Sequence, residues 1–226
     1  EECIICCLPL PPQSTLHKYQ TCCGKVLCLG CIHAAWMADN RKLCPFCRIL
    51  GTTSDEEQLE RFKKRAERGD ACAIYNMGGM YYRGDMGLPQ DYGKAVELAL
   101  QAGDLGHSAS YRNVGSAYYM GEGVERDLKK AKHYWELAAM GGNVDARHKL
   151  GFLECNAGNM KKAVMHYMIS AGAGYDLSLE VIRELFSDGH ATKDDYETAL
   201  RAHKEANDEM KSDQRDAAVV YYGKDV

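Results

Sequence analysis

The chain has 226 residues, of which 46% are hydrophobic and 27% are charged, and its formal net charge is −4. This composition suits one large or two small globular domains and excludes a collagen-like or disordered chain. No apolar stretch of the sequence approaches the ~18–20 residues of a membrane span, and a mildly acidic charge gives no electrostatic reason to expect nucleic acid. We therefore expect neither a membrane nor a nucleic acid as a partner.

Cysteines are concentrated at the start of the chain, where the first fifty residues hold nine of the eleven. Six of these nine form C-x-x-C pairs: Cys3/Cys6, Cys28/Cys31 and Cys44/Cys47. Two thiolates at this spacing can chelate one tetrahedral zinc ion. A disulfide scaffold is disfavoured by the odd total and the strict pairing, and a redox pair by the absence of a βαβ pattern. We therefore predict zinc in a reducing compartment, with the protein intracellular, in the cytoplasm or the nucleus.

Residues 1–50 are predicted to form a zinc-dependent domain. A segment of this length buries too little apolar surface to fold unaided, so the metal is expected to be part of its fold. Residues 51–69 are predicted to be a linker and a connecting helix. Ser54 and Glu57 have capping-box spacing, which places the start of that helix at Asp55.

Residues 70–206 are repetitive. Four alanines recur at spacings of 36, 32 and 36 residues: Ala95, Ala131, Ala163 and Ala199. Four positions before each lies a residue that favours helix N-caps: Asp91, Asp127, Asn159 and Asp195. Turn glycines end the preceding helical segment in three of the units: Gly84, Gly121 and Gly189. The period predicts a helical solenoid of four two-helix units, the fourth weakly marked.

Glycines and aromatic residues recur in register inside these helices. Because a helical glycine costs ~1 kcal/mol relative to alanine, the repeated glycines indicate close helix packing: Gly78, Gly115 and Gly151. We interpret the aromatic stripe as core: Tyr81, Tyr118 and Phe186, with Tyr82 and Tyr119 beside them. Residues 207–226 are predicted to be a helix and tail that cap the last layer of the solenoid.

The repeat region resembles a known family. It carries Met77-Gly78, Gly121-x-Gly123-Val124, Asp127-x-x-Lys130-Ala131 and Ala138-Ala139-x-Gly141. With these motifs, residues 70–206 resemble the Sel-one-like repeats, which are relatives of tetratricopeptide repeats. That family forms right-handed α-solenoids that scaffold protein complexes. The resemblance implies that the solenoid binds a protein substrate or adaptor.

The cysteine-rich region resembles a RING-type zinc finger. The matching pattern is Cys3-x-x-Cys6, Cys22-Cys23-Gly24-Lys25, Cys28-x-x-Cys31 and Cys44-Pro45-Phe46-Cys47-Arg48. In RING domains two zinc sites interleave in a cross-brace. The resemblance implies two zinc ions, one on Cys3, Cys6, Cys28 and Cys31 and the other on Cys22, Cys23, Cys44 and Cys47. The expected fold is therefore mostly α, with a small RING cross-brace domain followed by an α-α solenoid.

The pair Cys22-Cys23 departs from the RING pattern. A RING often has histidine as its fourth ligand, but Lys25 stands where it would fall, and a lysine ammonium has no lone pair for zinc. We favour both cysteines as ligands, because a closed structural site needs four. His17 as a substitute ligand and an incomplete second site are the alternatives. Cys7 is expected to be an ordinary thiol.

The resemblance also implies a function. A RING-type ubiquitin ligase positions a ubiquitin-charged conjugating enzyme and forms no covalent intermediate of its own. The contacts with that enzyme would be made by Ile5, Trp36, Pro45 and Arg48, where the arginine fork could bind two carbonyls together. The main hypothesis is therefore a RING-type ligase with a conjugating enzyme and ubiquitin as partners. The alternative is a non-catalytic zinc-binding scaffold or adaptor.

Overall fold

The computed structural model of the chain describes residues 2–12, 14–39, 41–52 and 54–222; the tail predicted to follow residue 222 lies outside this part. Its elements, in chain order, are η1 (Ser14–Leu16), β1 (His17–Gln20), β2 (Lys25–Cys28), α1 (Leu29–Ala38), α2 (Asp55–Ala66), α3 (Ala71–Arg83), α4 (Tyr92–Asp104), α5 (Ser108–Met120), α6 (Leu128–Met140), α7 (Val144–Asn156), α8 (Met160–Gly172), α9 (Asp176–Ser187), α10 (Lys193–Met210) and α11 (Asp213–Tyr222). None of the helices in these described ranges is long and apolar enough to cross a membrane.

Residues 2–50 form a small unit that we call the cysteine module. Strands β1 and β2 pair antiparallel, with Tyr19 opposite Val26, and the chain then enters α1. Two isolated bridges close its loops, one joining Glu2 to Pro9 and the other joining Leu43 to Leu50. Its core is small and consists largely of metal-ligand candidates: Cys3, Leu27, Cys28, Cys31 and Ile32.

The solenoid begins with α3 and follows the predicted repeat. Helices α3 and α4, α5 and α6, and α7 and α8 pack as pairs, and each pair packs on the next. Asp91 caps α4 by accepting a bond from the Lys94 amide, and Asp127 caps α6 in the same way. Gly84 and Gly121 end α3 and α5 in the left-handed conformation, with φ of 73° and 80°. Ser54 caps α2, which begins at Asp55 as predicted.

Two predicted caps differ from those observed. Helix α10, the second helix of the fourth predicted unit, is capped by Thr192 and not by Asp195. The carboxylate of Asp195 instead completes a capping box with Thr192. Asn159 precedes α8 but makes no capping bond, because its amide donates to Glu154 at 2.8 Å. In both cases the polar side chain bonds to a residue other than the helix amide that the spacing indicates: Asp195 bonds to Thr192, and Asn159 bonds to Glu154.

The repeated glycines lie where helices approach closely. A Cβ on Gly115 would stand 2.4 Å from Cδ1 of Trp135, and one on Gly151 would stand 2.9 Å from the ring of Tyr167. Trp135 and Tyr167 are each only 2% exposed. The absent side chains therefore make room for two large core aromatics of the following helices.

The aromatic stripe is only partly core. Tyr81 and Tyr118 are half-buried and pack against core clusters, and Tyr119 packs on Trp135. Tyr82 is 45% exposed and Phe186 is 38% exposed, so the prediction was wrong for these two. Tyr82 instead lines an open groove of the solenoid, described below.

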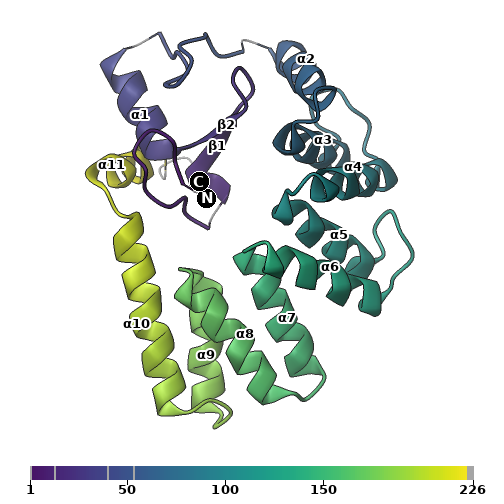
Figure 1. The fold of residues 1–226 in the computed structure, drawn as a ribbon, viewed down its shortest axis with the longest axis vertical. Helices are drawn as coiled ribbons and strands as arrows, with labels where there is room; N and C mark the ends of the chain where they lie inside the picture. The colour runs from purple at the N-terminus through teal and green to yellow at the C-terminus, as the bar shows by residue number, and fades with distance from the viewer. Residues whose placement is uncertain (1, 13, 40, 53, 223–226) are drawn as a thin grey trace.

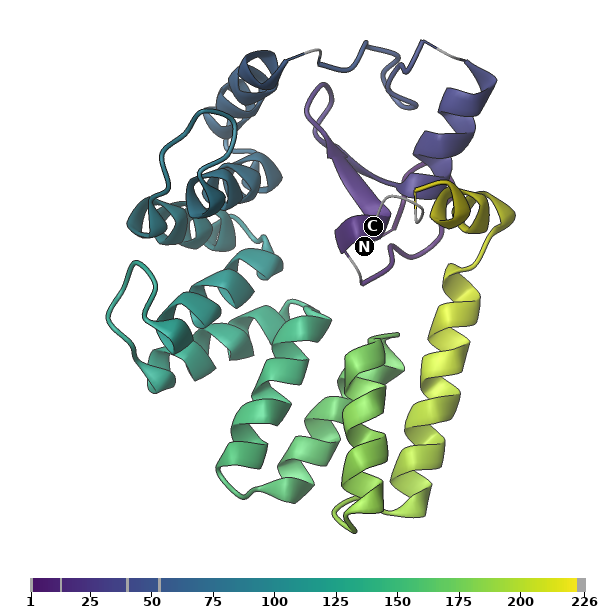
Figure 2. The ribbon, with the colours of Figure 1, turned by 180° about the vertical axis from the view of Figure 1, so that it is seen from behind.

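The solenoid curves until its last helices return to the cysteine module. Figure 1 shows the helices α2 to α10 as an arc with the module between its ends, and Figure 2 shows the same closure from behind. Helix α10 packs on α8 and α9 and continues past residue 206 to Met210. The predicted boundary at 206–207 therefore falls inside α10. The predicted cap was also wrong, because α11 packs on α1 rather than on the last layer of the solenoid.

A buried carboxylate joins three helices of the solenoid. Glu154 is 5% exposed and accepts bonds from Lys132 at 2.7 Å and Asn159 at 2.8 Å. These two bonds, the lysine's first, lower the pKa of Glu154 below its ordinary value. A carboxyl whose pKa is lower in the folded state stabilises the fold at neutral pH, and that contribution is lost as the pH falls through the folded pKa.

We expect Glu154→Gln to lower the free energy of unfolding at pH 7 by about 1–2 kcal/mol, since hydrogen bonds to charged groups contribute about 1.5–3 kcal/mol and Lys132 is partly screened by solvent. The difference from wild type should shrink as the pH falls below 4.5, the ordinary value. Urea denaturation at pH 7 and pH 4 measures both. Glu136→Gln, an exposed change on α6, is the control. A difference that grows at low pH would contradict the assignment.

Candidate metal centres

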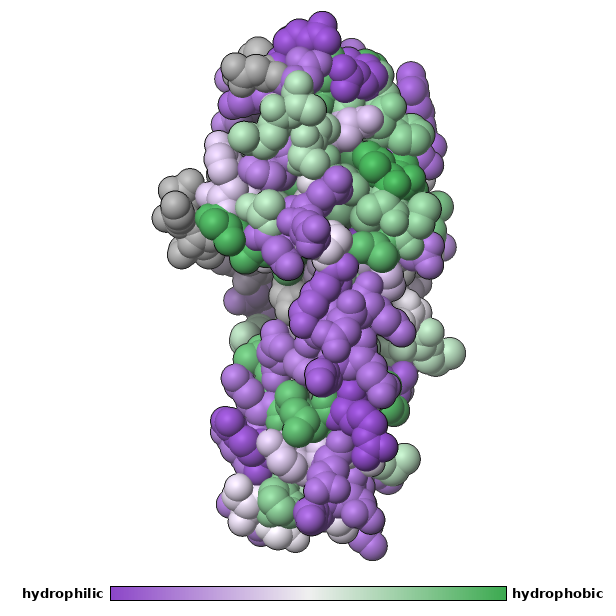
Figure 3. Space-filling view, turned by 90° about the vertical axis from the view of Figure 1, so that its left-hand side faces the viewer, coloured by the Kyte–Doolittle hydropathy of each residue, from purple (hydrophilic) through white to green (hydrophobic). Residues whose placement is uncertain are grey.

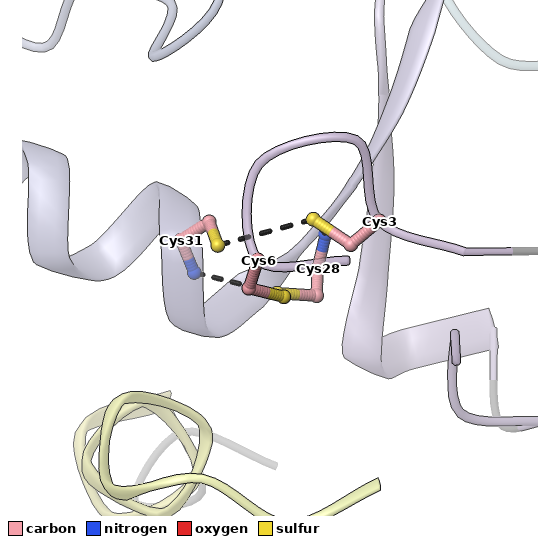
Figure 4. Close-up of side chains that lie close together, drawn as sticks. All are labelled: Cys3, Cys6, Cys28 and Cys31. Carbon is pink, nitrogen blue, oxygen red and sulfur yellow. Dashed lines mark hydrogen bonds between the residues drawn. The ribbon is translucent and has the colours of Figure 1, made fainter. Parts of the chain in front are cut away.

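The first cysteine set joins two loops of the module to the start of α1. Cys3 and Cys6 lie on a turn in which the Cys7 amide donates to the Cys3 carbonyl at 2.8 Å. Cys28 ends β2 and caps α1, where its Sγ accepts a bond from the amide of Cys31. Figure 4 shows the four side chains pointing toward one another. The Sγ atoms of Cys3 and Cys31 are 3.8 Å apart, as are those of Cys6 and Cys28.

The second set lies at the hairpin turn and the last loop of the module. It consists of Cys22, Cys23, Cys44 and Cys47, and its Sγ atoms lie within 4.8 Å of one another, as those of the first set do. The Sγ of Cys23 is 3.8 Å from that of Cys44, and the Sγ of Cys47 is 3.3 Å from that of Cys22. This set is less buried than the first.

The turn explains how two adjacent cysteines reach one centre. The amides of Cys23 and Gly24 both donate to the carbonyl of Gln20, and Gly24 has a left-handed φ of 72°. Among the alternatives left open above, the geometry therefore gathers both Cys22 and Cys23. His17 lies at the other end of the hairpin, paired with Cys28, and is not part of the group.

Both sets fit zinc. A regular tetrahedron with Zn–S bonds of ~2.3 Å has sulfur–sulfur edges of ~3.8 Å, which is the distance found for three of the four pairs above. A disulfide would need ~2.05 Å, and no disulfide links the eleven cysteines, all of which lie in the described ranges. Four thiolates suit Zn²⁺. The two sets can therefore hold metal ions. That these ions are zinc stays a prediction.

The thiols of each set do not ionise alike. Against the effect of burial, backbone hydrogen bonds from Cys28, Cys6 and Ile5 lower the pKa of Cys3 to about 6. Burial, followed by the hydrogen bond and the charge of Cys28, raises the pKa of Cys31 well above its ordinary value. Burial, with the charge of Cys44 adding to it, raises the pKa of Cys23 to about 11. Thiols held this close resist joint ionisation. A divalent cation among them reverses that preference and favours the thiolates.

The four predicted contacts of a conjugating enzyme do not line one pocket. Ile5 is 42% exposed on the first loop, and Pro45 is half-buried on the last. Trp36 packs against the core of the module and lines a 380 Å³ cavity between the module and α2, whose described lining includes none of the other three. Arg48 forms an ion pair with Asp39 at 2.9 Å.

Arginines that sequence analysis missed lie beside both sets. Arg65 of α2 donates to the carbonyls of Thr21 at 2.6 Å and Cys22 at 2.9 Å, next to the second set. Its third contact is Asp70, which also accepts a bond from the Tyr19 hydroxyl at 2.7 Å. Burial and this bond raise the pKa of Tyr19 well above its ordinary value. Arg215 of α11 lies beside the first set. No local pattern marks either residue.

The solenoid carries a groove between α3, α4 and α5. Its volume is about 460 Å³. Three tyrosines, two arginines, two asparagines, one serine and one acid line it: Tyr75, Tyr82, Tyr92, Arg83, Arg112, Asn76, Asn113, Ser116 and Glu122. The Tyr82 hydroxyl donates to Glu122 at 3.0 Å, and Arg112 is 3.3 Å from Asp145. Arg83 forms an ion pair with Asp85, so the groove offers mainly aromatic and uncharged side chains.

Comparison with known proteins identifies the repeats. The Sel1 repeat family matches residues 73–107 and 108–143. Two Arabidopsis thaliana proteins, the ERAD-associated E3 ubiquitin-protein ligase components HRD3B and HRD3A, are 30% and 36% identical over 113 and 111 residues. These matches cover 50% and 46% of this chain. They cover only 18% and 16% of the relatives, so the chain spans less than a fifth of either protein.

Solved structures agree with this assignment. A Sel1 repeat protein from Oxalobacter formigenes superposes with a TM-score of 0.59 at 27% identity, covering 67% of this chain and 64% of that one. A protective antigen of uropathogenic Escherichia coli gives a TM-score of 0.58 at 25% identity, covering 69% and 34%. The chain therefore contains Sel1 repeats at residues 73–143, within an α-solenoid like those of the two solved structures.

Proposed function

We propose that the chain is a zinc-binding scaffold protein, in which the cysteine module holds two zinc ions and the solenoid binds a protein partner. The observation that carries this proposal is the groove between α3, α4 and α5, which lies within the matched Sel1 repeats. The two tetrahedrally spaced cysteine sets support the metal part. The relatives HRD3B and HRD3A, which are named as components of a ubiquitin-protein ligase, support a role within protein complexes.

In this proposal the metal is structural. Each ion is held by one of the two sets: Cys3, Cys6, Cys28 and Cys31, or Cys22, Cys23, Cys44 and Cys47. Four thiolates leave no open coordination position for water, so the zinc supplies cross-links and no hydrolytic chemistry. We place the protein in the cytoplasm or the nucleus, where clustered thiols stay reduced.

The groove indicates what the partner offers. Tyr75, Tyr82 and Tyr92 present aromatic surface. The two arginines of the lining are already paired with acids, Arg83 with Asp85 and Arg112 with Asp145, so they add no excess of positive charge. A peptide segment with apolar side chains fits this surface, because aromatic faces take apolar groups. We therefore propose an apolar segment of a partner protein as the occupant.

The test is to fill the groove. Ser116 lines it, so Ser116→Trp should block it, whereas Lys129→Trp places the same side chain on an exposed position of α6 outside its lining. Purification of tagged protein from its native cells, followed by mass spectrometry, should recover partners with wild type and Lys129→Trp that are lost with Ser116→Trp. Identical sets of partners from all three proteins would overturn the assignment of the groove.

A RING-type ubiquitin ligase is the second candidate, favoured by the interleaving of the cysteine pairs along the chain. Stimulated discharge of ubiquitin from a conjugating enzyme separates the two functions. If the chain is a ligase, it should stimulate the discharge, and Ile5→Ala and Arg48→Ala should reduce that stimulation. Arg41→Ala is the control and should not reduce it, because Arg41 is the other arginine that pairs with Asp39. The scaffold requires no stimulation across a panel of conjugating enzymes. The ion pair that Arg48 forms with Asp39 favours the scaffold.

A further inference from the structure

The last described helix, α11, is packed tightly against the first, α1 (Figure 1). A Cβ on Gly30 would stand 2.8 Å from the backbone nitrogen of Arg215 and 3.0 Å from its Cα. Only glycine at position 30 therefore allows this approach. Further along α1, the ring of His33 lies 4.8 Å from that of Tyr221 and 5.8 Å from that of Tyr222.

Arg215 ties this helix to the loop of the first cysteine set. Its Nη1 donates to the carbonyls of Pro9 and Met210, each at 2.7 Å. Its Nη2 lies 3.3 Å from the carbonyl of Leu8 and 3.7 Å from the Sγ of Cys6. The residue is only 7% exposed. One guanidinium thus bonds to a candidate metal ligand, to the loop that follows it and to the end of α10.

Charge complementarity makes zinc and Arg215 mutually stabilising. Four thiolates around one Zn²⁺ carry a net charge of −2, and a buried guanidinium that donates to one of the sulfurs offsets part of it. Conversely, a buried arginine is costly without partners, and two of its carbonyl partners lie on a loop that the metal would hold in place. Helix α11 has ten residues, which is shorter than the ~12–15 that a helix needs to be even marginally stable alone.

The surface around α11 differs from that of α10. Figure 3 shows the outer face of α10 as mostly hydrophilic, with hydrophobic side chains gathered above it over the cysteine module and α11. Met37 of α1 and Val219 and Val220 of α11 are exposed apolar residues of these elements. The end of the arc meets the module through α11, which packs on α1.

We propose that Arg215 is a positioning residue that couples zinc binding at the first cysteine set to docking of α11, so that metal occupancy there holds the ring of helices closed. This inference rests on the zinc-binding part of the proposed function. The inference goes beyond the proposed function because it makes closure of the solenoid depend on the metal. Arg65 provides a comparison within the same protein. It lies on α2, the helix that follows the module, and donates to carbonyls beside the second cysteine set.

The test uses the zinc-loaded chain of residues 1–226 and two readouts. Hydrogen exchange followed by mass spectrometry measures the protection of residues 213–222, and a chromophoric chelator measures the rate of zinc release. We expect Arg215→Ala to abolish the protection of α11 and to speed release of one of the two zinc ions by about 10- to 100-fold, the range for partners of metal ligands. Arg215→Lys should be intermediate, since one ammonium cannot replace the fork.

Three further proteins keep the test falsifiable. Gly30→Ala should also release α11, although it leaves Arg215 intact and does not harm α1 as a helix. Arg201→Ala, an exposed change on α10, should behave as wild type. Arg65→Ala should speed release of the other zinc ion and leave α11 protected. Protection of α3 to α8 reports whether each variant is folded.

The outcomes separate this inference from the proposed function. If zinc analysis finds no metal on the first set, the proposed function loses that ion and the coupling is overturned with it. If two ions are bound and α11 keeps its protection after zinc removal or in Arg215→Ala, only the coupling is overturned. Unchanged zinc release in both Arg215→Ala and Gly30→Ala overturns it as well.

Discussion

Chelation of zinc is expected to unfold residues 2–50 while α3 to α8 stay folded. The core of the module is small, and three of the five residues in its main buried cluster are cysteines of the first set. Structural zinc contributes apparent binding free energies of about 10–16 kcal/mol in small zinc peptides, which exceeds what so few buried side chains supply. The solenoid has core clusters of its own, which contain no member of either set.

Hydrogen exchange resolved by segment measures this result. After addition of a zinc chelator, amides of residues 2–50 should exchange at close to the rates of an unfolded chain, while those of α3 to α8 keep their protection. Zinc analysis of single variants supplies the control. Cys28→Ser should lose one zinc ion per chain, whereas Cys7→Ser should keep both, because Cys7 is exposed and outside the two sets. A module that keeps its protection without zinc would contradict a metal-dependent fold.

Trp135→Ala is expected to cause the largest loss of stability among single substitutions in the solenoid. The indole is 2% exposed, fills the space that Gly115 leaves, and donates from Nε1 to the carbonyl of Arg112 at 3.1 Å. Truncation of a buried tryptophan removes its transfer energy and leaves a cavity, at a typical cost of about 3–5 kcal/mol. It also removes one of two side-chain donors to this carbonyl, which still accepts a bond from the Ser116 hydroxyl at 3.1 Å.

Equilibrium unfolding in urea, followed by far-ultraviolet circular dichroism, gives the free-energy change. Met140→Ala on the same helix is the matched control, because Met140 is 81% exposed and its loss should change stability by no more than about 0.5 kcal/mol. Gly115→Ala tests the same contact from the other side, and overpacking should cost about 1–3 kcal/mol. A loss below about 1 kcal/mol for Trp135→Ala would mean that the α5–α6 contact contributes little.

The sequence allowed the local features to be predicted and left the distant ones open. Capping residues such as Asp91 and the turn glycine Gly84 act within one helical turn, so their spacing alone indicates the helix ends. The C-x-x-C pairs are equally local. Their grouping into two sets depended on the resemblance to RING domains, and the structure brings the same cysteines together.

Contacts between distant parts of the chain could not be predicted. Trp36 packs against the core of the module and lines the cavity beside α2, and its contact with a conjugating enzyme stays a prediction. Arg215 contacts Pro9 across 206 residues of chain, and a contact at that separation leaves no pattern in the sequence.

The close fit of α11 at Gly30 limits how this solenoid can change in evolution. An open array of repeats can gain or lose a unit at little cost, since each unit contacts only its neighbours. Here the arc must return to a fixed point, because α11 reaches α1 only if the preceding helices bring it there. Insertion or deletion of one repeat would move α11 away from Gly30 by the thickness of a layer. Closure against α1 therefore constrains the number of repeats between the two ends of the arc.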